Sequence, residues 1–140
     1  MDQKIIDFLD KERIAVLSVI QEDGCPHAAS VHFSHDADPF RIYIQTSRTS
    51  KKAQPLLEGS ISKAAMVVGF SEEEWVTVQM QGDIRILSDQ TEADQAYMVH
   101  YKKSPDAEKR RGPDTVILEF VPTWIRYTDF KTNPKTIIEM

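Results

Sequence analysis

Residues 40–52 read FRIYIQTSRTSKK and join a strand-like run, Phe40 to Gln45, to a short helix-like segment through the turn Thr46 to Lys52. The turn carries three cationic side chains and four hydroxyls. A helix start leaves backbone N–H groups unpaired and bears a partial positive charge, so it binds an anion by both geometry and field. Because the turn lacks glycine, it does not match a Walker-type loop and favours charge-assisted hydrogen bonds from its two lysines. The stretch therefore predicts a phosphate site, and a solvated loop with Ser50 as helix N-cap is the alternative.

The composition is that of one ordinary globular domain, residues 1–140. With 41% apolar and 28% charged residues, the chain can bury a core, and its length fits a single domain. The net charge of -5 argues against a nucleic-acid or anionic-membrane binder, which needs a broad basic face. The single cysteine, Cys25, cannot form an internal disulfide, the N-terminus lacks the layout of a signal peptide, and no apolar run reaches membrane-spanning length. We therefore expect a cytoplasmic protein.

Apolar patterning divides the chain into many strands and few helices. Asp2 to Lys11 carries one apolar stripe, which predicts a short helix, and a capping box at Thr91 predicts a second helix to about Lys103. Short apolar or alternating runs bounded by turn residues predict strands at Ile14–Ile20, Pro26–His35, Phe40–Gln45, Ala64–Phe70, Trp75–Leu87, Thr115–Val121 and Trp124–Phe130. Since most strands neighbour each other in sequence, we expect a mainly β fold, a small closed or nearly closed antiparallel barrel with peripheral helices.

The run WVTVQMQGDIRIL, residues 75–87, alternates most clearly. Thr77, Gln79 and Gln81 fall on one face and the intervening apolar residues on the other. A polar sheet surface is therefore expected to face something other than the core. Gly82 indicates a bulge or a close approach of two backbones.

Three motifs in this order resemble the pyridoxamine 5′-phosphate oxidase-like flavin-binding split barrels. They are GCPH at residues 24–27, TSRTSKK at residues 46–52 and WVTVQMQG at residues 75–82. The match covers most of the chain, whose short length most resembles the general stress protein subgroup. The resemblance implies a six-stranded antiparallel split β-barrel that forms a homodimer, with flavin mononucleotide (FMN) in a groove between the subunits. Candidate interface residues are Trp124, Ile125 and Tyr127.

The resemblance also implies which residues bind the cofactor. Lys51 and Lys52 would hold the FMN phosphate, and Ser50 would add a hydroxyl. The second-strand segment would lie along the isoalloxazine ring, and Thr77 takes the place of a ring-contacting glutamine. The full set is Ala29, Ser30, Val31, His32, Gln45, Thr46, Ser50, Lys51, Lys52 and Thr77.

Two departures from the family pattern bear on the reaction. Ala29 stands where many members have an arginine, and the C-terminal arginine-histidine motif that holds the substrate in true oxidases is absent. We expect a flavin-dependent oxidoreductase with an unassigned small-molecule substrate or electron donor and no identified catalytic side chain, since the flavin does the redox chemistry. Efficient pyridoxamine 5′-phosphate oxidase activity is not expected. The alternatives are a non-catalytic flavin-binding stress or sensor protein and a split barrel that binds haem, and a deazaflavin in place of FMN also fits the sequence.

Other polar residues offer further hypotheses. His27 and His35 share one face of the predicted strand and His32 lies on the other, so we expect no metal site. Cys25 has no evident partner for nucleophilic chemistry beyond His27. The basic stretch Lys102 to Arg111 is either a solvated helix end or a mouth that attracts an anionic substrate.

Overall fold

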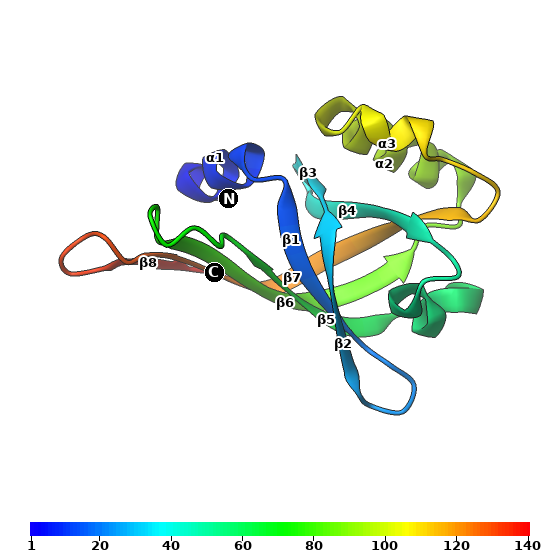
Figure 1. Cartoon of the computed structure of the whole chain (residues 1–140), viewed down its shortest axis with the longest axis horizontal. Coiled ribbons are helices and arrows are strands. Elements are labelled where there is room, and N and C mark those ends of the chain that lie inside the picture. The colour runs from blue at the N-terminus through cyan, green and yellow to red at the C-terminus, as the bar shows by residue number, and fades with distance from the viewer.

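Six long strands and two short ones form one antiparallel sheet, and the computed structural model describes residues 1–140 (Figure 1). The elements are α1 (Gln3–Lys11), β1 (Ile14–Ile20), β2 (Pro26–His32), β3 (Ser34–Ala37), β4 (Phe40–Ser47), the 3₁₀ helix η1 (Lys51–Gly59), β5 (Ser62–Val68), β6 (Val76–Ile86), α2 (Gln90–Lys103), α3 (Asp106–Lys109), β7 (Thr115–Asp129) and β8 (Thr136–Glu139). The strand order is β2-β1-β5-β6-β7-β4-β3, and β8 pairs with the second half of β7. The predicted antiparallel split barrel with peripheral helices is confirmed.

The barrel closes where the chain bends at Phe33. The prediction of one strand from Pro26 to His35 is wrong, because β2 pairs with β1 whereas β3 pairs with β4. The two strands at opposite ends of the sheet order are thus joined by a single residue, whose ring is fully buried. Burying such a ring contributes about 1.5–3 kcal/mol to the free energy of unfolding. Core packing therefore stabilises the bend, while β2 and β4 remain unpaired across the split.

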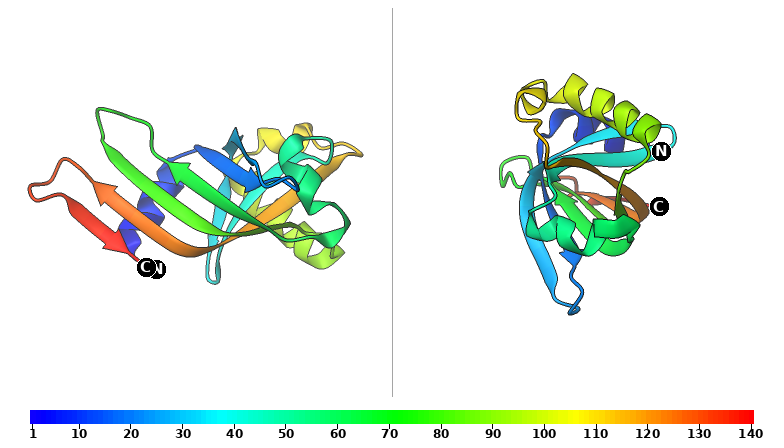
Figure 2. Two further views of the ribbon diagram at one scale, coloured as in Figure 1. Left: turned by 90° about the horizontal axis from the view of Figure 1, so that it is seen from below. Right: turned by 90° about the vertical axis from the view of Figure 1, so that its right-hand side faces the viewer.

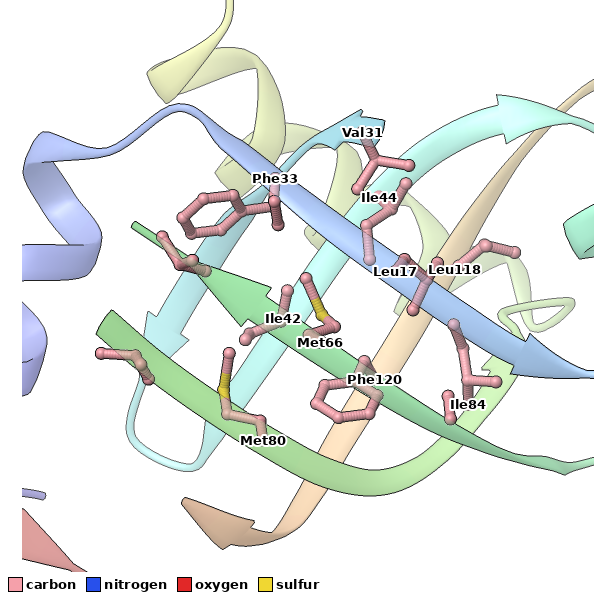
Figure 3. Close-up of a cluster of buried hydrophobic side chains, with 14 of the residues drawn as sticks. Leu17, Val31, Phe33, Ile42, Ile44, Met66, Met80, Ile84, Leu118 and Phe120 are labelled. Carbon is pink, nitrogen blue, oxygen red and sulfur yellow. The ribbon is translucent and has the colours of Figure 1, made fainter. Parts of the chain in front are cut away.

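One apolar core fills the barrel. Alternate residues of each strand point inward, so β1 supplies Leu17, β4 supplies Ile42 and Ile44, and β7 supplies Phe120 (Figure 3). A second, smaller cluster lies outside the barrel, where α2 packs on β4 and β7. Its buried members are Tyr43, Leu87, Ala96, Tyr97 and Ile117. The strand β4 is therefore covered on both faces.

A bulge between β6 and β7 allows one long strand where two were predicted. The separate strands Thr115–Val121 and Trp124–Phe130 are wrong, since β7 runs unbroken through Pro122. The register shifts between Gln81 and Gly82, and Gly82 pairs with Pro122, so the residue without an N–H falls at the irregularity. A Cβ on Gly82 would lie 2.1 Å from the Val121 carbonyl oxygen, which confirms the close approach expected there.

The helices lie outside the barrel, and η1 lies across one end of it (Figure 2). The α1 helix begins as predicted, with the Asp2 side chain accepting a hydrogen bond from the Lys4 amide. The predicted cap of α2 at Thr91 is wrong, because Asp89 accepts the hydrogen bond from the Glu92 amide. No helix combines the length and the apolar character needed to cross a membrane.

Candidate functional site

A chain of hydroxyl hydrogen bonds shapes the turn between β4 and η1. Thr46 Oγ1 donates to Ser50 Oγ over 3.2 Å, and Ser50 Oγ donates to the Ser47 carbonyl over 2.7 Å. Ser47 Oγ and Thr49 Oγ1 lie 2.8 Å apart. Ser50 holds the N-cap position of η1, but its side chain bonds backwards into the turn and caps no amide of the helix. The structure thus brings Thr46 and Ser50 together and leaves the start of η1 without a side-chain cap.

Lys52 is a half-buried cation without a partner. Burial alone lowers its pKa below the ordinary value, and no carboxylate or hydrogen-bond acceptor offsets that effect. The backbone amides of Lys51 and Lys52 also donate to no protein group. A partly buried charge without compensation costs free energy. An ammonium group and free amides at a helix start are together suited to bind an anion.

Lys51 lies in different surroundings from Lys52. Its exposed side chain lines a cavity of about 530 Å³ together with Glu22, Asp23 and Glu58. Three carboxylates around this cavity repel a phosphate. Of the two adjacent lysines, only Lys52 stands apart from acidic side chains, so it is the stronger candidate for an anion contact.

Gln45 points away from the hydroxyl chain. Because β4 residues alternate, its side chain shares the outer face with Tyr43 rather than the face of Thr46. Its amide nitrogen donates to the Ala107 carbonyl over 2.9 Å, and its amide oxygen accepts from the Tyr101 hydroxyl over 2.5 Å. The structure therefore uses Gln45 to attach α2 and α3 to β4, and does not bring its side chain together with Thr46 and Ser50.

The second-strand candidates divide between the two faces of β2. Ala29 and Val31 face the barrel interior, where they pair with Leu17 and Ala15 of β1, and Ser30 and His32 are exposed on the outside. The other edge of β2 has no strand partner. Contact with a flat ligand along this segment would therefore run through the free edge and the exposed side chains.

Thr77 lies far from Lys52 within one chain. It sits on the outer face of β6 opposite Thr128. Ile84 lies at the end of β6 nearest η1. It pairs with Ser62, the first residue of β5, and β5 begins shortly after η1 ends. Seven residues of strand separate Thr77 from Ile84, roughly 23 Å. One chain alone does not bring Thr77 to the turn.

The serine–histidine contact of the chain and the histidine of its third strand lie away from the turn. Ser34 Oγ and His100 Nδ1 lie 2.8 Å apart, but both residues are buried, so the hydroxyl cannot reach a substrate. His35 is held by packing on Phe40, and burial lowers its pKa. No group of three or more His, Cys, Asp or Glu side chains is placed to hold a metal ion.

The sequence did not predict that Tyr101 and Ala107 are the hydrogen-bond partners of Gln45. It also did not predict the hydrogen bond that the Arg48 amide donates to the Asp114 carbonyl over 2.8 Å. These contacts join segments about sixty residues apart, and no local pattern predicts them. Strand alternation does place Gln45 and Thr46 on opposite faces, and it was the available signal for their separation.

The fold matches solved structures of low sequence identity. General stress protein 26 from Bacillus anthracis is 22% identical, with 99% of this chain and 97% of that chain covered and a TM-score of 0.69. A haem-binding protein from Mycobacterium smegmatis is 13% identical, with 95% and 54% covered and a TM-score of 0.74. A haem storage protein from Vibrio cholerae is 12% identical, with 86% and 89% covered and a TM-score of 0.72. At these identities the likeness shows the fold alone. Comparison with curated protein sequences finds no match.

A family model covers most of the chain. The model described as pyridoxamine 5′-phosphate oxidase matches residues 1–129, which include β2, the turn after β4 and all of β6. This agrees with the three motifs that carried the resemblance in sequence. The chain therefore belongs to the pyridoxamine 5′-phosphate oxidase family.

Proposed function

We propose that this protein binds FMN with its phosphate at the turn between β4 and η1 and uses the flavin in an oxidation–reduction reaction. The observation that carries the proposal is Lys52, a half-buried ammonium with no protein partner. A phosphate would accept hydrogen bonds from Lys52 and from the free amides at the start of η1. The hydroxyls of Thr46 and Ser50 lie in the same turn, and either could exchange its internal hydrogen bond for the phosphate.

The flavin ring would lie along the free edge of β2, beside Ser30 and His32. In this arrangement the ring supplies the electron or hydride chemistry, and the chain binds the phosphate, orients the ring and leaves one ring face open. Flavin reduction needs no protein nucleophile, so the proposal requires no catalytic side chain at the turn.

We further propose a homodimer, because part of the outer face of the sheet is open and mainly apolar, with Gln79 and Gln81 as polar members. A hollow of about 460 Å³ on this face is lined by Val16, Ala65, Val67 and Trp124, among others. An uncovered apolar surface of this kind is typical of an interface, and two-fold pairing would create two equivalent sites. A second copy would also bring the Thr77 end of its sheet toward the flavin of the first. The expectation that Ile125 and Tyr127 lie at this interface is wrong, because both pack in the barrel core.

Light scattering tests the dimer. The wild type should have a dimer mass at micromolar concentration, and Ala65→Asp, which places a charge on an exposed position of this face, should have a monomer mass and weaker FMN binding. A monomeric wild type that binds FMN fully would contradict the dimer.

The late strand lacks a free cation to hold a phosphorylated substrate. Arg126 is already bound, with its guanidinium 2.9 Å from Glu139, and Lys131 lies in the loop beyond β7. A substrate phosphate without a cationic clamp loses hydration without replacement. Turnover of pyridoxamine 5′-phosphate should therefore be slow even if FMN binds well, since remote binding energy positions the reacting carbon.

The decisive experiment loads the purified protein with FMN, records the visible flavin spectrum, and then adds reduced nicotinamide or pyridoxamine 5′-phosphate without oxygen. We expect bound flavin, reduction by a nicotinamide and slow reduction by the pyridoxamine compound. Bound flavin that no donor reduces would support the non-catalytic alternative. Failure to bind FMN, together with a haem spectrum after addition of haemin, would replace the proposal with the haem function named for two similar structures.

A further inference from the structure

A separate cavity lies on the outer face of β4, between the sheet and α2, which Figure 1 shows above β4. Its volume is about 300 Å³. Arg41 and Tyr43 of β4 and Glu119 of β7 line it from the sheet, and Gln95 lines it from α2. Because neighbouring residues of a strand face opposite ways, this cavity lies across the sheet from the barrel interior. It is distinct from the proposed FMN site.

Tyr43 contributes an unused hydrogen-bond donor to the cavity. The residue is only 9% exposed, and its hydroxyl makes no hydrogen bond. The one fully enclosed side-chain nitrogen or oxygen without a partner is His35 Nδ1, so the Tyr43 hydroxyl is open to the cavity. Burial raises the pKa of Tyr43, and Glu119 and Asp36 add to the effect, which keeps the hydroxyl protonated. Buried phenols usually find a partner, so this one is available for a ligand acceptor.

The charges around the cavity are unevenly paired. Glu119 accepts a hydrogen bond from Arg85 at 3.0 Å, and Arg85 also reaches Glu92 at 3.0 Å, so this group is internally compensated. Arg41 is less well paired: one guanidinium nitrogen donates to the Phe40 carbonyl over 2.8 Å, and its nearest carboxylate oxygen, on Glu119, is 3.9 Å away. Asp36 lines the same cavity and forms no ion pair. Glu92 and Glu119 of the lining are thus bound to Arg85, whereas Arg41 has no carboxylate closer than 3.9 Å and Asp36 has no cationic partner.

We propose that this cavity binds a free L-α-amino acid with a small aliphatic side chain. Its carboxylate accepts hydrogen bonds from Arg41 and Tyr43, and its ammonium group pairs with Asp36. Its side chain lies against the apolar part of the lining, which consists of Pro39, Leu87 and Val99. Asp36 and Arg41 are opposite each other in the β3–β4 register but form no ion pair, so a ligand with both charges can contact both at once. A ligand with only one charge can contact only one of them, and the arrangement therefore favours a zwitterion.

Calorimetric titration of the full chain with L-valine and L-leucine tests the proposal, with isobutylamine and isovalerate as analogues that carry one charge. At least one of the two amino acids should bind saturably, and each analogue should bind at least tenfold more weakly. Tyr43→Phe keeps the ring that packs under α2 and removes only the hydroxyl, and should weaken binding at least fivefold. Asp36→Asn should also weaken binding of the amino acid at least fivefold. Because Asp36 is exposed, this variant is expected to fold even if Tyr43→Phe does not.

Asp38→Asn is the matched control, because Asp38 is an exposed turn residue outside the cavity. This variant should bind the amino acid with the same affinity as the wild type. The proposal fails if neither amino acid gives saturable heat, if isovalerate or isobutylamine binds as tightly as the amino acid, or if Asp36→Asn leaves the affinity unchanged. FMN titrated into the same samples reports on the proposed function separately, since Asp36 and Tyr43 lie outside the turn.

Discussion

Two cations of this protein, Lys52 and Arg85, are both partly covered by the fold, yet their surroundings differ completely. Arg85 donates to Glu119 and Glu92, and its hydrogen bond to Glu119 is the main reason why its pKa is raised. Lys52 has no such partner, and burial lowers its pKa. The first charge is compensated within the chain. The second is not, and this difference is why Lys52, rather than Arg85, is the cation in the proposed anion site.

A cation that holds elements of the fold together and a cation that binds a ligand are expected to differ in their surroundings. A partly buried cation that pairs with carboxylates joins elements, here β6, β7 and the start of α2. A partly buried cation without a partner weakens the empty fold and gains compensation only when an anion binds. Substitutions at the two kinds of site should therefore change stability in opposite directions.

The largest expected effect concerns His100, a buried base with cationic neighbours. Burial, followed by His32, Lys103 and Arg110, lowers its pKa from 6.5 to about 4. Between these pH values His100 binds a proton in the unfolded chain but not in the folded chain. Its protonation therefore costs no stability above pH 6.5, and the free energy of unfolding falls as the pH drops to about 4. The difference of 2.5 pKa units corresponds to a loss of about 3 kcal/mol.

Urea unfolding of the wild type and His100→Gln, at neutral pH and near pH 4, measures this loss. Over that pH range the free energy of unfolding should fall by about 3 kcal/mol more in the wild type than in the variant. The carboxylates titrate in both proteins, so their effect cancels in this difference. Equal losses in the two proteins would mean that His100 does not stay neutral in the fold.

The next effect tests the compensated cation. Glu119→Gln removes the carboxylate that Arg85 and Arg41 share, and should lower the free energy of unfolding by about 2 kcal/mol. This is less than the roughly 3–5 kcal/mol typical of a fully buried pair, because the Arg85 side chain is 40% exposed. Chemical unfolding gives the number. Glu92→Gln, which breaks only an exposed pair, is the control and should cost less than about 1 kcal/mol. Equal effects of the two substitutions would remove the distinction between them.

The smallest effect has the opposite sign. Lys52→Met keeps the aliphatic length of the side chain and removes the uncompensated charge, so it should stabilise the FMN-free protein by about 0.5 kcal/mol. Lys51→Met, at an exposed position, is the matched control and should leave stability unchanged. Thermal unfolding of the two variants without flavin compares them. A destabilised Lys52→Met would show that the ammonium already has a favourable role in the empty fold.

Local pattern predicted most elements of the fold but not where the barrel closes. Alternation in β6 and the bulge at Gly82 were visible in sequence, because both follow from residues that are adjacent in the chain. The bend at Phe33 was not, since it depends on which strand each half of Pro26–His35 pairs with. The unbroken β7 was missed because the bulge on β6 accommodates Pro122. Both the bend at Phe33 and the unbroken β7 therefore depend on which strands pair in the folded chain.

The candidate site was predicted in part for the same reason. Its hydroxyls and lysines are consecutive in sequence, so the turn was recognisable. The different surroundings of Lys51 and Lys52 depend on Glu22, Asp23 and Glu58, two of which come from the distant β1–β2 turn. Thr77 remains a prediction. Within one chain it lies far along β6 from Lys52, and the proposed homodimer is the arrangement that would bring it to the flavin.

Calorimetric titration of FMN and riboflavin into the wild type and Lys52→Met measures whether the turn after β4 binds the FMN phosphate. We expect the wild type to bind FMN much more tightly than riboflavin. Lys52→Met should lose about 1.5–3 kcal/mol of FMN affinity, the scale of a charge-assisted hydrogen bond, and keep its riboflavin affinity. Equal affinity of the wild type for FMN and riboflavin, or an unchanged FMN affinity in Lys52→Met, would contradict the assignment of the phosphate to this turn.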